Sequence, residues 1–274
     1  MANLQVLRKR FRSIQATADM ASAMKTAATV KYAKISRELA NIEDYSLACS
    51  ETLTLFGDAV LTRSTNKISS RNCLVLFSNN RGFCGGFNGE LLRFFETRLA
   101  AETEPPMLLV LGQKGIAFCK SKNLEFESLP FNDIPSYKDA ETMTERLFGL
   151  YADGTVNRID IIYQFFKNMM VQVPTAETIL PHPVQDTELK RDLLFLPDKE
   201  TAMLAPAMYC LINSIYGIML SHSAGIQAAT TIAMRSACDN AEKSLEKLET
   251  LINRIRQAEV TNSVIETSSY INFE

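Results

Sequence analysis

Residues 4–56 of the chain read LQVLRKRFRSIQATADMASAMKTAATVKYAKISRELANIEDYSLACSETLTLF, and this stretch decides the fold. It contains neither glycine nor proline, since the first glycine of the chain is Gly57 and the first proline is Pro105. Alternating steps of three and four residues along it land on apolar or small residues, except at Lys25 and Ser46. A 3.5-residue repeat is typical of a helix in a coiled-coil seam. Such a helix would run about 80 Å, longer than a compact domain needs.

The other end of the chain carries a similar pattern. No proline follows Pro206. A seam runs over residues 208–232, its phase then slips, and it resumes over residues 241–255. We therefore predict a second long helix that reaches about residue 267.

Two long terminal helices that flank one domain are expected to pair antiparallel. Each helix alone would expose its apolar seam to water. Both are rich in alanine, which allows their backbones to approach closely. The predicted organisation is a coiled-coil helix over residues 1–61, a central domain over residues 71–200, and a partner helix over residues 206–267.

The middle of the chain predicts an α/β domain. Polar residues 62–70 form the expected linker, and residues 193–197 form a short extended piece before the last helix. Apolar runs that read as strands alternate with segments that read as helices, which favours a Rossmann-like layered fold with a largely parallel sheet. The expected strands are 72–78, 107–112, 159–166 and 171–179, and the expected helices are 90–102, 114–122 and 140–151. The fold class is thus mixed α+β and α/β, a terminal antiparallel coiled coil beside a central α/β domain.

Composition and charge narrow the classes of function. With 46% hydrophobic and 22% charged residues, the chain has the composition of a folded soluble protein, and no run approaches 18 consecutive apolar residues. Residues 1–40 hold eight basic and two acidic residues, a net charge of +6, whereas the remainder carries −8. This asymmetry predicts an acidic partner for the N-terminal end. Nucleic acid and a merely solvated helix face are the alternatives.

Residues that usually carry chemistry are scattered. The six cysteines form no CxxC pair and have no histidine at ligand spacing, so we expect buried, reduced thiols. His182 and His222 belong to no recognisable catalytic or metal motif. We accordingly predict no catalytic group, no metal and no cofactor in this chain.

One glycine-rich loop invites a different interpretation. Residues 78–90, SNNRGFCGGFNGE, lie between a predicted strand and a predicted helix, where a phosphate-binding loop would lie. The Lys and Ser/Thr of such a loop do not follow Gly86. We therefore expect a tight turn, with Gly85 and Gly86 closing it at positive φ. A nucleotide-dependent α/β enzyme with a coiled-coil arm stays the alternative, and a coiled-coil adaptor that binds nucleic acid through residues 8–37 is a third hypothesis.

Four blocks, taken together and in order, resemble the γ subunit of the F-type ATP synthase. They are LRKRFRSIQATADMASAMKTAATVKYAK, SNNRGFCGGFN, FFKNMMVQVPTAETILP and AATTIAMRSACDNAEKSLEKLETLINRIRQAEVTNSVIE. They resemble that family's opening helix, its S-D-R-G-L-C-G-G loop, its F-x-N-x-x-x-Q-x-P segment and its closing helix. The resemblance covers nearly the whole chain.

The resemblance implies a rotor. The paired terminal helices would be the shaft inside a hexamer of α and β subunits, and the α/β domain with the ε subunit would form a foot on the membrane c-ring. Proton flow would turn the shaft, which biases the catalytic sites of the β subunits without holding a catalytic group. The implied place is the cytoplasmic face of the cell membrane, where the chain would be a peripheral protein within the F1FO complex. It would meet the membrane only through its partners and would bind no nucleic acid.

The resemblance also implies interface residues. Met24 and Lys25 would lie near the acidic lever loops of the β subunits, and Arg256, Gln257 and Thr261 would contact a β-subunit loop. The ring contact at the foot would involve Leu194, Phe195 and Leu196. The chain departs from the family at Lys25-Thr26, Thr230-Thr231, Leu196, Ser263 and residues 269–274, which puts the contacts at those positions in doubt.

Overall fold

The computed structural model describes residues 2–56, 71–181 and 199–271. The chain divides into two compact units. The larger unit is Thr29–Ala229, and the smaller combines Met1–Ala28 with Thr230–Glu274. Both long helices contribute residues to both units.

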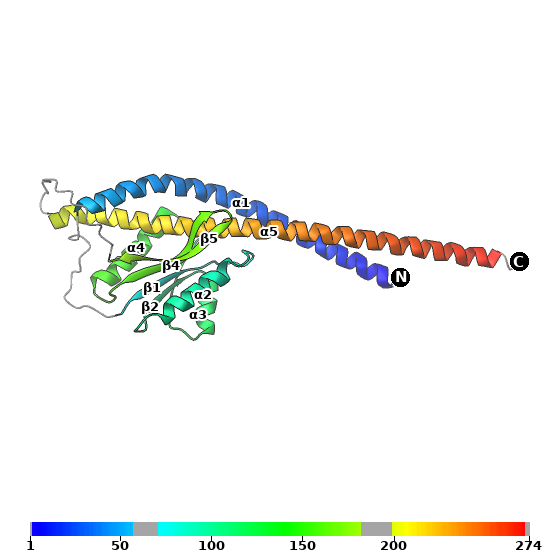
Figure 1. Cartoon of the computed structure of the whole chain (residues 1–274), viewed down its shortest axis with the longest axis horizontal. Coiled ribbons are helices and arrows are strands. Elements are labelled where there is room, and N and C mark those ends of the chain that lie inside the picture. The colour runs from blue at the N-terminus through cyan, green and yellow to red at the C-terminus, as the bar shows by residue number, and fades with distance from the viewer. Residues whose placement is uncertain (1, 57–70, 182–198, 272–274) are drawn as a thin grey trace. The chain divides into compact units, whose positions relative to one another are not determined.

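The two predicted terminal helices are present (Figure 1). Helix α1 spans Ala2–Phe56, and helix α5 spans Lys199–Ile271. Every predicted seam position of α1 whose side chain is described is buried or half-buried. The expected start of α5 at residue 206 was wrong, because Pro206 lies inside the helix. A proline there removes one N–H donor, and the buried residues that follow it outweigh this loss.

The sheet of the larger unit has five strands in the order β3-β2-β1-β4-β5. Their bounds are β1 Cys73–Phe77, β2 Met107–Leu111, β3 Glu127–Leu129, β4 Ile159–Asn168 and β5 Val171–Leu180. The first four strands run parallel, and β5 returns antiparallel beside β4. The prediction of a largely parallel sheet is confirmed.

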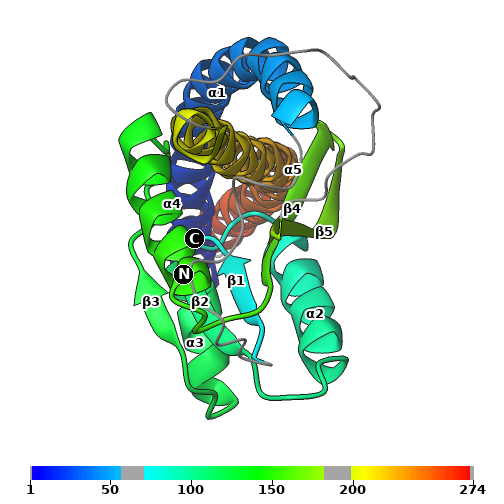
Figure 2. The same cartoon turned by 90° about the vertical axis from the view of Figure 1, so that its left-hand side faces the viewer.

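Helices cover both faces of this sheet (Figure 2). On one face, α2 (Phe87–Ala100) and α3 (Gln113–Ser121) pack on alternate residues of β1 and β2 such as Leu74 and Leu108. On the other face, α4 (Tyr137–Ala152) and the portion of α5 before Thr230 pack on the intervening residues, such as Val75 and Leu109. Because both faces are covered, the central strands consist of continuous apolar residues rather than alternating ones.

Two differences from the predicted elements have local causes. Strand β3 was not predicted, since three residues are too few for a pattern. Helix α4 begins at Tyr137 and not at residue 140, because Ser136 and Asp139 form a reciprocal capping box before the first apolar position.

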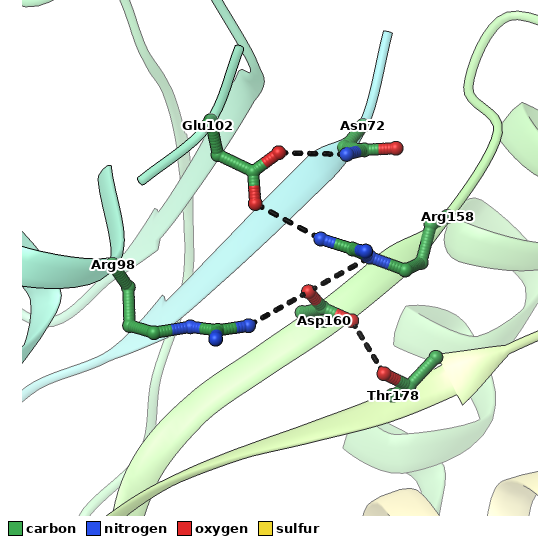
Figure 3. Close-up of polar contacts among 6 residues, drawn as sticks. All are labelled: Asn72, Arg98, Glu102, Arg158, Asp160 and Thr178. Carbon is green, nitrogen blue, oxygen red and sulfur yellow. Dashed lines mark hydrogen bonds and ion pairs between the residues drawn. The ribbon is translucent and has the colours of Figure 1, made fainter. Parts of the chain in front are cut away.

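A polar network centred on a buried aspartate lies at the amino ends of the strands (Figure 3). Asp160 of β4, with a side chain only 1% exposed, pairs with Arg158 at 3.0 Å and Arg98 at 3.4 Å. Its other oxygen accepts a 2.7 Å hydrogen bond from the Thr178 hydroxyl. Arg158 also pairs with Glu102 at 2.9 Å. The network thereby joins the end of α2 to β4 and β5, and its charges are mutually compensated.

Within the larger unit, α1 and α5 pack against each other in antiparallel register. A β-carbon at Gly217 of α5 would meet Ile42 of α1 at 3.5 Å, an ordinary contact distance. Seven residues back along α5 and seven forward along α1, the Cys210 thiol lies 3.5 Å from the Cys49 carbonyl oxygen. Lys31 of α1 also pairs with Asp133 at 2.6 Å. The antiparallel pairing predicted from the two seams holds in this unit.

Helix α5 is long and apolar enough, by length and composition, to cross a membrane. The apolar segment lies within Leu204–Ile265, and 61% of it is buried inside the protein. Its residues from Ala207 to Ala228 are almost all buried between α1 and the sheet. A helix that is apolar on every side is expected where it forms the core of a unit.

Candidate functional site

The crevice in which α/β folds usually bind ligands lies at the carboxyl ends of the strands, where the strand order reverses. In this sheet the reversal is between β1 and β4. Side chains of the chain itself fill that place: the His222 ring of α5 lies against the rings of Phe77, Phe87 and Phe131, at centroid distances of 6.0, 5.5 and 5.9 Å. A helix of the protein thus occupies the position where a nucleotide would bind in a Rossmann-like enzyme.

His222 is held there by a directed hydrogen bond. Strand β4 extends past the end of β1, and its edge is completed by α5: the backbone N–H of Gln164 donates to His222 Nδ1 at 3.1 Å, and that of Phe166 donates to the Ser221 hydroxyl at 3.0 Å. Because a backbone N–H can only donate, Nδ1 is unprotonated and the proton of the neutral ring is on Nε2. Full burial lowers the pKa of His222 to about 3, so the ring is neutral at physiological pH.

The glycine-rich loop after β1 is closed by its own hydrogen bonds. The Ser78 hydroxyl donates to the Leu111 carbonyl at 2.7 Å and accepts from the Gly115 N–H at 2.8 Å, so it belongs to the packing between two loops. Gly85 has the predicted positive φ, +58°. The prediction for Gly86 was wrong: it has φ −76° and caps α2, and the second positive φ is at Phe83, +66°.

A surface pocket of about 460 Å³ lies at the opposite, amino edge of the strands. Its lining includes Glu102, Pro105 and Leu124. The carboxylate of Glu102 is engaged by Arg158 and by the Asn72 amide at 2.7 Å. This pocket therefore adjoins the polar network and lies far along the strands from the crevice that α5 fills.

The smaller unit brings the two ends of the chain together. Ala21 of α1 and Met234 and Cys238 of α5 form its buried cluster, and Met24 packs against that cluster from α1. The Cys238 thiol lies 3.9 Å from the Ala18 carbonyl oxygen, so the backbones approach closely. Met24, predicted as an interface residue, is half-buried at the edge of this packing.

The seam of α5 changes phase earlier than predicted. Ile232 was expected in the seam but is 36% exposed. Met234 and Cys238 are buried instead, and they start the series that continues through Leu245 and Leu248. The phase of the seam therefore changes at the Thr230-Thr231 pair, where the sequence also departs from the family pattern. In the sequence, the boundary between the two compact units falls at the same place.

The other predicted interface residues lie on the smaller unit. Lys25 is half-buried, whereas Arg256, Gln257 and Thr261 are exposed. Gln257 and Thr261 share one face of α5, and the Thr261 hydroxyl donates to the Gln257 carbonyl at 2.9 Å. The acceptor is the backbone carbonyl, so the Gln257 side-chain amide takes no part in this bond, and both residues are exposed. Leu194, Phe195 and Leu196, predicted for the foot, lie outside the described residues, as do the expected linker 62–70 and extended piece 193–197.

The structure adds apolar residues to this surface that the sequence analysis missed. Val260, Val264 and Ile265 are 59%, 61% and 60% exposed. Together with Arg256, Gln257 and Thr261 they form two adjacent rows along α5, in which the residues are four apart. One row consists of residues 256, 260 and 264, and the other of residues 257, 261 and 265. We call these six residues the α5 end patch. Clustered, exposed apolar side chains indicate a binding surface, and the pair at positions 260 and 264 was the signal in the sequence.

Comparisons with known proteins identify the family of the chain. The family model described as ATP synthase matches residues 3–269. The ATP synthase gamma chain of Moorella thermoacetica is 30% identical over 276 residues, covering 97% of each chain, and that of Bacteroides thetaiotaomicron is 28% identical over 97% of this chain and 98% of its own. The chain belongs to the ATP synthase γ family. As a γ chain it is a non-catalytic, central-stalk subunit of ATP synthase, in the F1 part of that complex, which is peripheral on the membrane.

Chains of solved ATP synthase structures share the fold. A chain of the Euglena gracilis mitochondrial ATP synthase rotor superposes with a TM-score of 0.69 at 16% identity, over 94% of this chain and 99% of that one. A chain of the Tetrahymena thermophila central stalk and c-ring gives 0.61 at 20% identity, over 80% of this chain and 99% of that one. The predicted fold class, two long helices beside a central α/β domain, is confirmed for this γ chain.

Proposed function

We propose that this γ chain is a rotor that couples ion flow through a membrane c-ring to ATP synthesis or hydrolysis at α and β subunits. The ends of helices α1 and α5 would turn inside the hexamer of α and β subunits. The central α/β domain of this chain would stand on the c-ring together with the ε subunit. The complex would lie at the cytoplasmic face of the cell membrane. The chain supplies no reacting group; it favours one conformation of each catalytic site over another through differential contacts.

The α5 end patch is the observation that supports this role best. Three exposed apolar side chains beside Arg256, Gln257 and Thr261 are costly in water and suit a protein partner. The apolar residues provide a surface on which a partner can slide, because apolar contacts have no preferred direction. The polar residues provide directed contacts that can be made and broken at defined angles.

The exposed basic residues near the start of α1 support an acidic partner. Arg8, Lys9, Arg10 and Arg12 are all exposed and belong to the region with a net charge of +6. Their attraction to acidic loops of a β subunit would act over roughly one Debye length, about 8 Å at physiological salt. Coupling through this cluster should therefore weaken as the salt concentration rises.

The test is a rebuilt complex of α, β, ε and this γ chain, with the double variant Gln257→Ala and Thr261→Ala. We expect the isolated chain to fold normally, because both side chains are exposed, and the complex to lose coupled proton pumping or assembly. Glu246→Ala with Thr250→Ala is the matched control, since Thr250 donates to the Glu246 carbonyl at 2.9 Å on the same helix. Equal pumping by the two double variants would remove the polar pair from the interface.

A second measurement addresses the role of the whole chain. The isolated γ chain should hydrolyse no ATP, but its addition to α and β subunits should raise their turnover. Turnover by the purified chain alone would contradict a non-catalytic rotor and favour the alternative of a nucleotide-dependent enzyme.

A further inference from the structure

Two cysteines that are 161 residues apart in the sequence lie close together in the larger unit. Cys49 lies on α1 and Cys210 on α5. They continue the register set by Ile42 and Gly217, one heptad away along each helix. The two residues therefore occupy opposed positions on a paired set of antiparallel helices.

The thiols are close together and shielded. The Cys210 sulfur lies 3.5 Å from the Cys49 carbonyl oxygen and is hydrogen-bonded to the Cys49 side chain. Cys49 is 8% exposed and Cys210 is 3% exposed. A disulfide requires the two sulfurs to approach to about 2.05 Å, which rotation of the side chains about χ1 can provide.

We propose that Cys49 and Cys210 form a redox-modification site, closing an intrachain disulfide when the protein meets a low-molecular-weight disulfide such as oxidised glutathione. The Cys49 thiolate attacks one sulfur of the oxidant and bonds to it, which gives a mixed disulfide. The S–S bond of the oxidant breaks, and its other sulfur leaves as one glutathione thiol. The Cys210 sulfur then attacks Cys49 and displaces the second glutathione. The two protein thiols are oxidised by two electrons, the oxidant is reduced to two thiols, and the two protons lost by the protein end on these glutathione thiols.

The environment sets the order and speed of these steps. Burial, helped by the hydrogen bond with Cys49, raises the pKa of the Cys210 thiol to about 12, so this sulfur is a poor first nucleophile. Cys49 is the more exposed partner, and it lies near the end of α1 at Phe56, while Cys210 lies near the start of α5 at Lys199. Helix ends fray more readily than helix centres, which admits the oxidant. The disulfide should thus form slowly and faster with rising pH.

The test treats the purified full-length chain with oxidised glutathione at about pH 7 and about pH 9, then blocks free thiols and maps peptides without reduction. We expect a peptide pair that joins Cys49 to Cys210, a mass loss of about 2 Da relative to the reduced pair, and reversal by dithiothreitol. The bond should form several-fold faster at the higher pH. The oxidised chain should also unfold at a higher urea concentration, because the cross-link closes a long loop.

Variants separate this pair from the other cysteines. Cys49→Ser and Cys210→Ser should each abolish the cross-linked peptide, whereas Cys119→Ala, which removes another fully buried cysteine, should leave it. If a variant does not fold, the peptide map of the parent chain alone shows whether Cys49 and Cys210 are joined. A folded parent that yields no peptide joining positions 49 and 210 under these conditions, or that joins either cysteine to a different one, would overturn the proposal.

Discussion

Replacing His222 with phenylalanine should alter both the stability of this γ chain and its dependence on pH. The substitution keeps an aromatic ring among Phe77, Phe87 and Phe131 but removes Nδ1, which accepts the Gln164 N–H. A buried backbone N–H left without an acceptor costs about 1–3 kcal/mol. The substitution also removes the buried Nε2–H, which has no hydrogen-bond partner among the described residues, so at neutral pH the variant should be less stable than the parent by at most about that amount.

Acid should reverse this order. The pKa of His222 is about 3 in the folded chain, below its value of about 6.5 when unfolded. Between these values the unfolded chain binds a proton that the folded chain does not, so the free energy of unfolding of the parent falls as the pH falls. The loss is about 1.4 kcal/mol per pH unit, or roughly 2–3 kcal/mol on going from neutral pH to about pH 4.5. The Phe variant lacks this proton, so the two stabilities should meet near about pH 5.

The assay is urea unfolding of both full-length chains, followed by circular dichroism, at about pH 7.5, 6 and 4.5. The quantity that matters is the difference between the two chains at each pH, because the titration of carboxylates and of His182 is common to both. A difference that stays constant over this range would show that His222 is protonated in the folded chain as readily as in the unfolded one. The interpretation of the filled crevice would then be refuted.

Three further predictions can be checked by the same unfolding measurement. Gly112→Ala should destabilise the chain by more than about 3 kcal/mol, since φ is +86° and a β-carbon would clash with the Ser78 carbonyl, whereas Gly86→Ala should cost less than about 1 kcal/mol; similar values for both would contradict the loop geometry. Asp160→Asn should cost about 2 kcal/mol, because two partly exposed arginines lose their buried counterion, and no loss would show that the network contributes nothing to stability. Lys31→Met should cost at most about 1 kcal/mol, and this cost should shrink in about 1 M salt; a cost independent of salt would point to packing rather than charge.

Much of the fold was readable from the sequence because its main signals are long. The seam of α1 repeats over more than fifty residues without a breaker, so errors at single positions cannot hide it. The apolar runs that form β1, β2 and β4 are buried on both faces, which makes them continuous and easy to recognise.

The sequence-based predictions that failed concern features that depend on tertiary contacts. Ile232 has the right residue type for the seam, but the packing that begins at Met234 turns it outward. Gly86 sits next to a glycine that does need positive φ, and the sequence cannot say which of two adjacent glycines turns the chain. The role of His222 could not be predicted at all, since its partner Gln164 lies 58 residues away on the end of a strand.

The two hydrogen bonds from β4 to His222 and Ser221 have a mechanical consequence. A helix held in a groove by apolar contacts alone could twist about its own axis at little cost, because such contacts have no directional preference. Hydrogen bonds weaken steeply when their angle changes, so these two bonds resist rotation of α5 relative to the sheet. In a rotor, a torque applied to the α/β domain would then be transmitted to α5 without rotation of the helix against the sheet. A chain that lacks both bonds should have a lower torsional stiffness at this point.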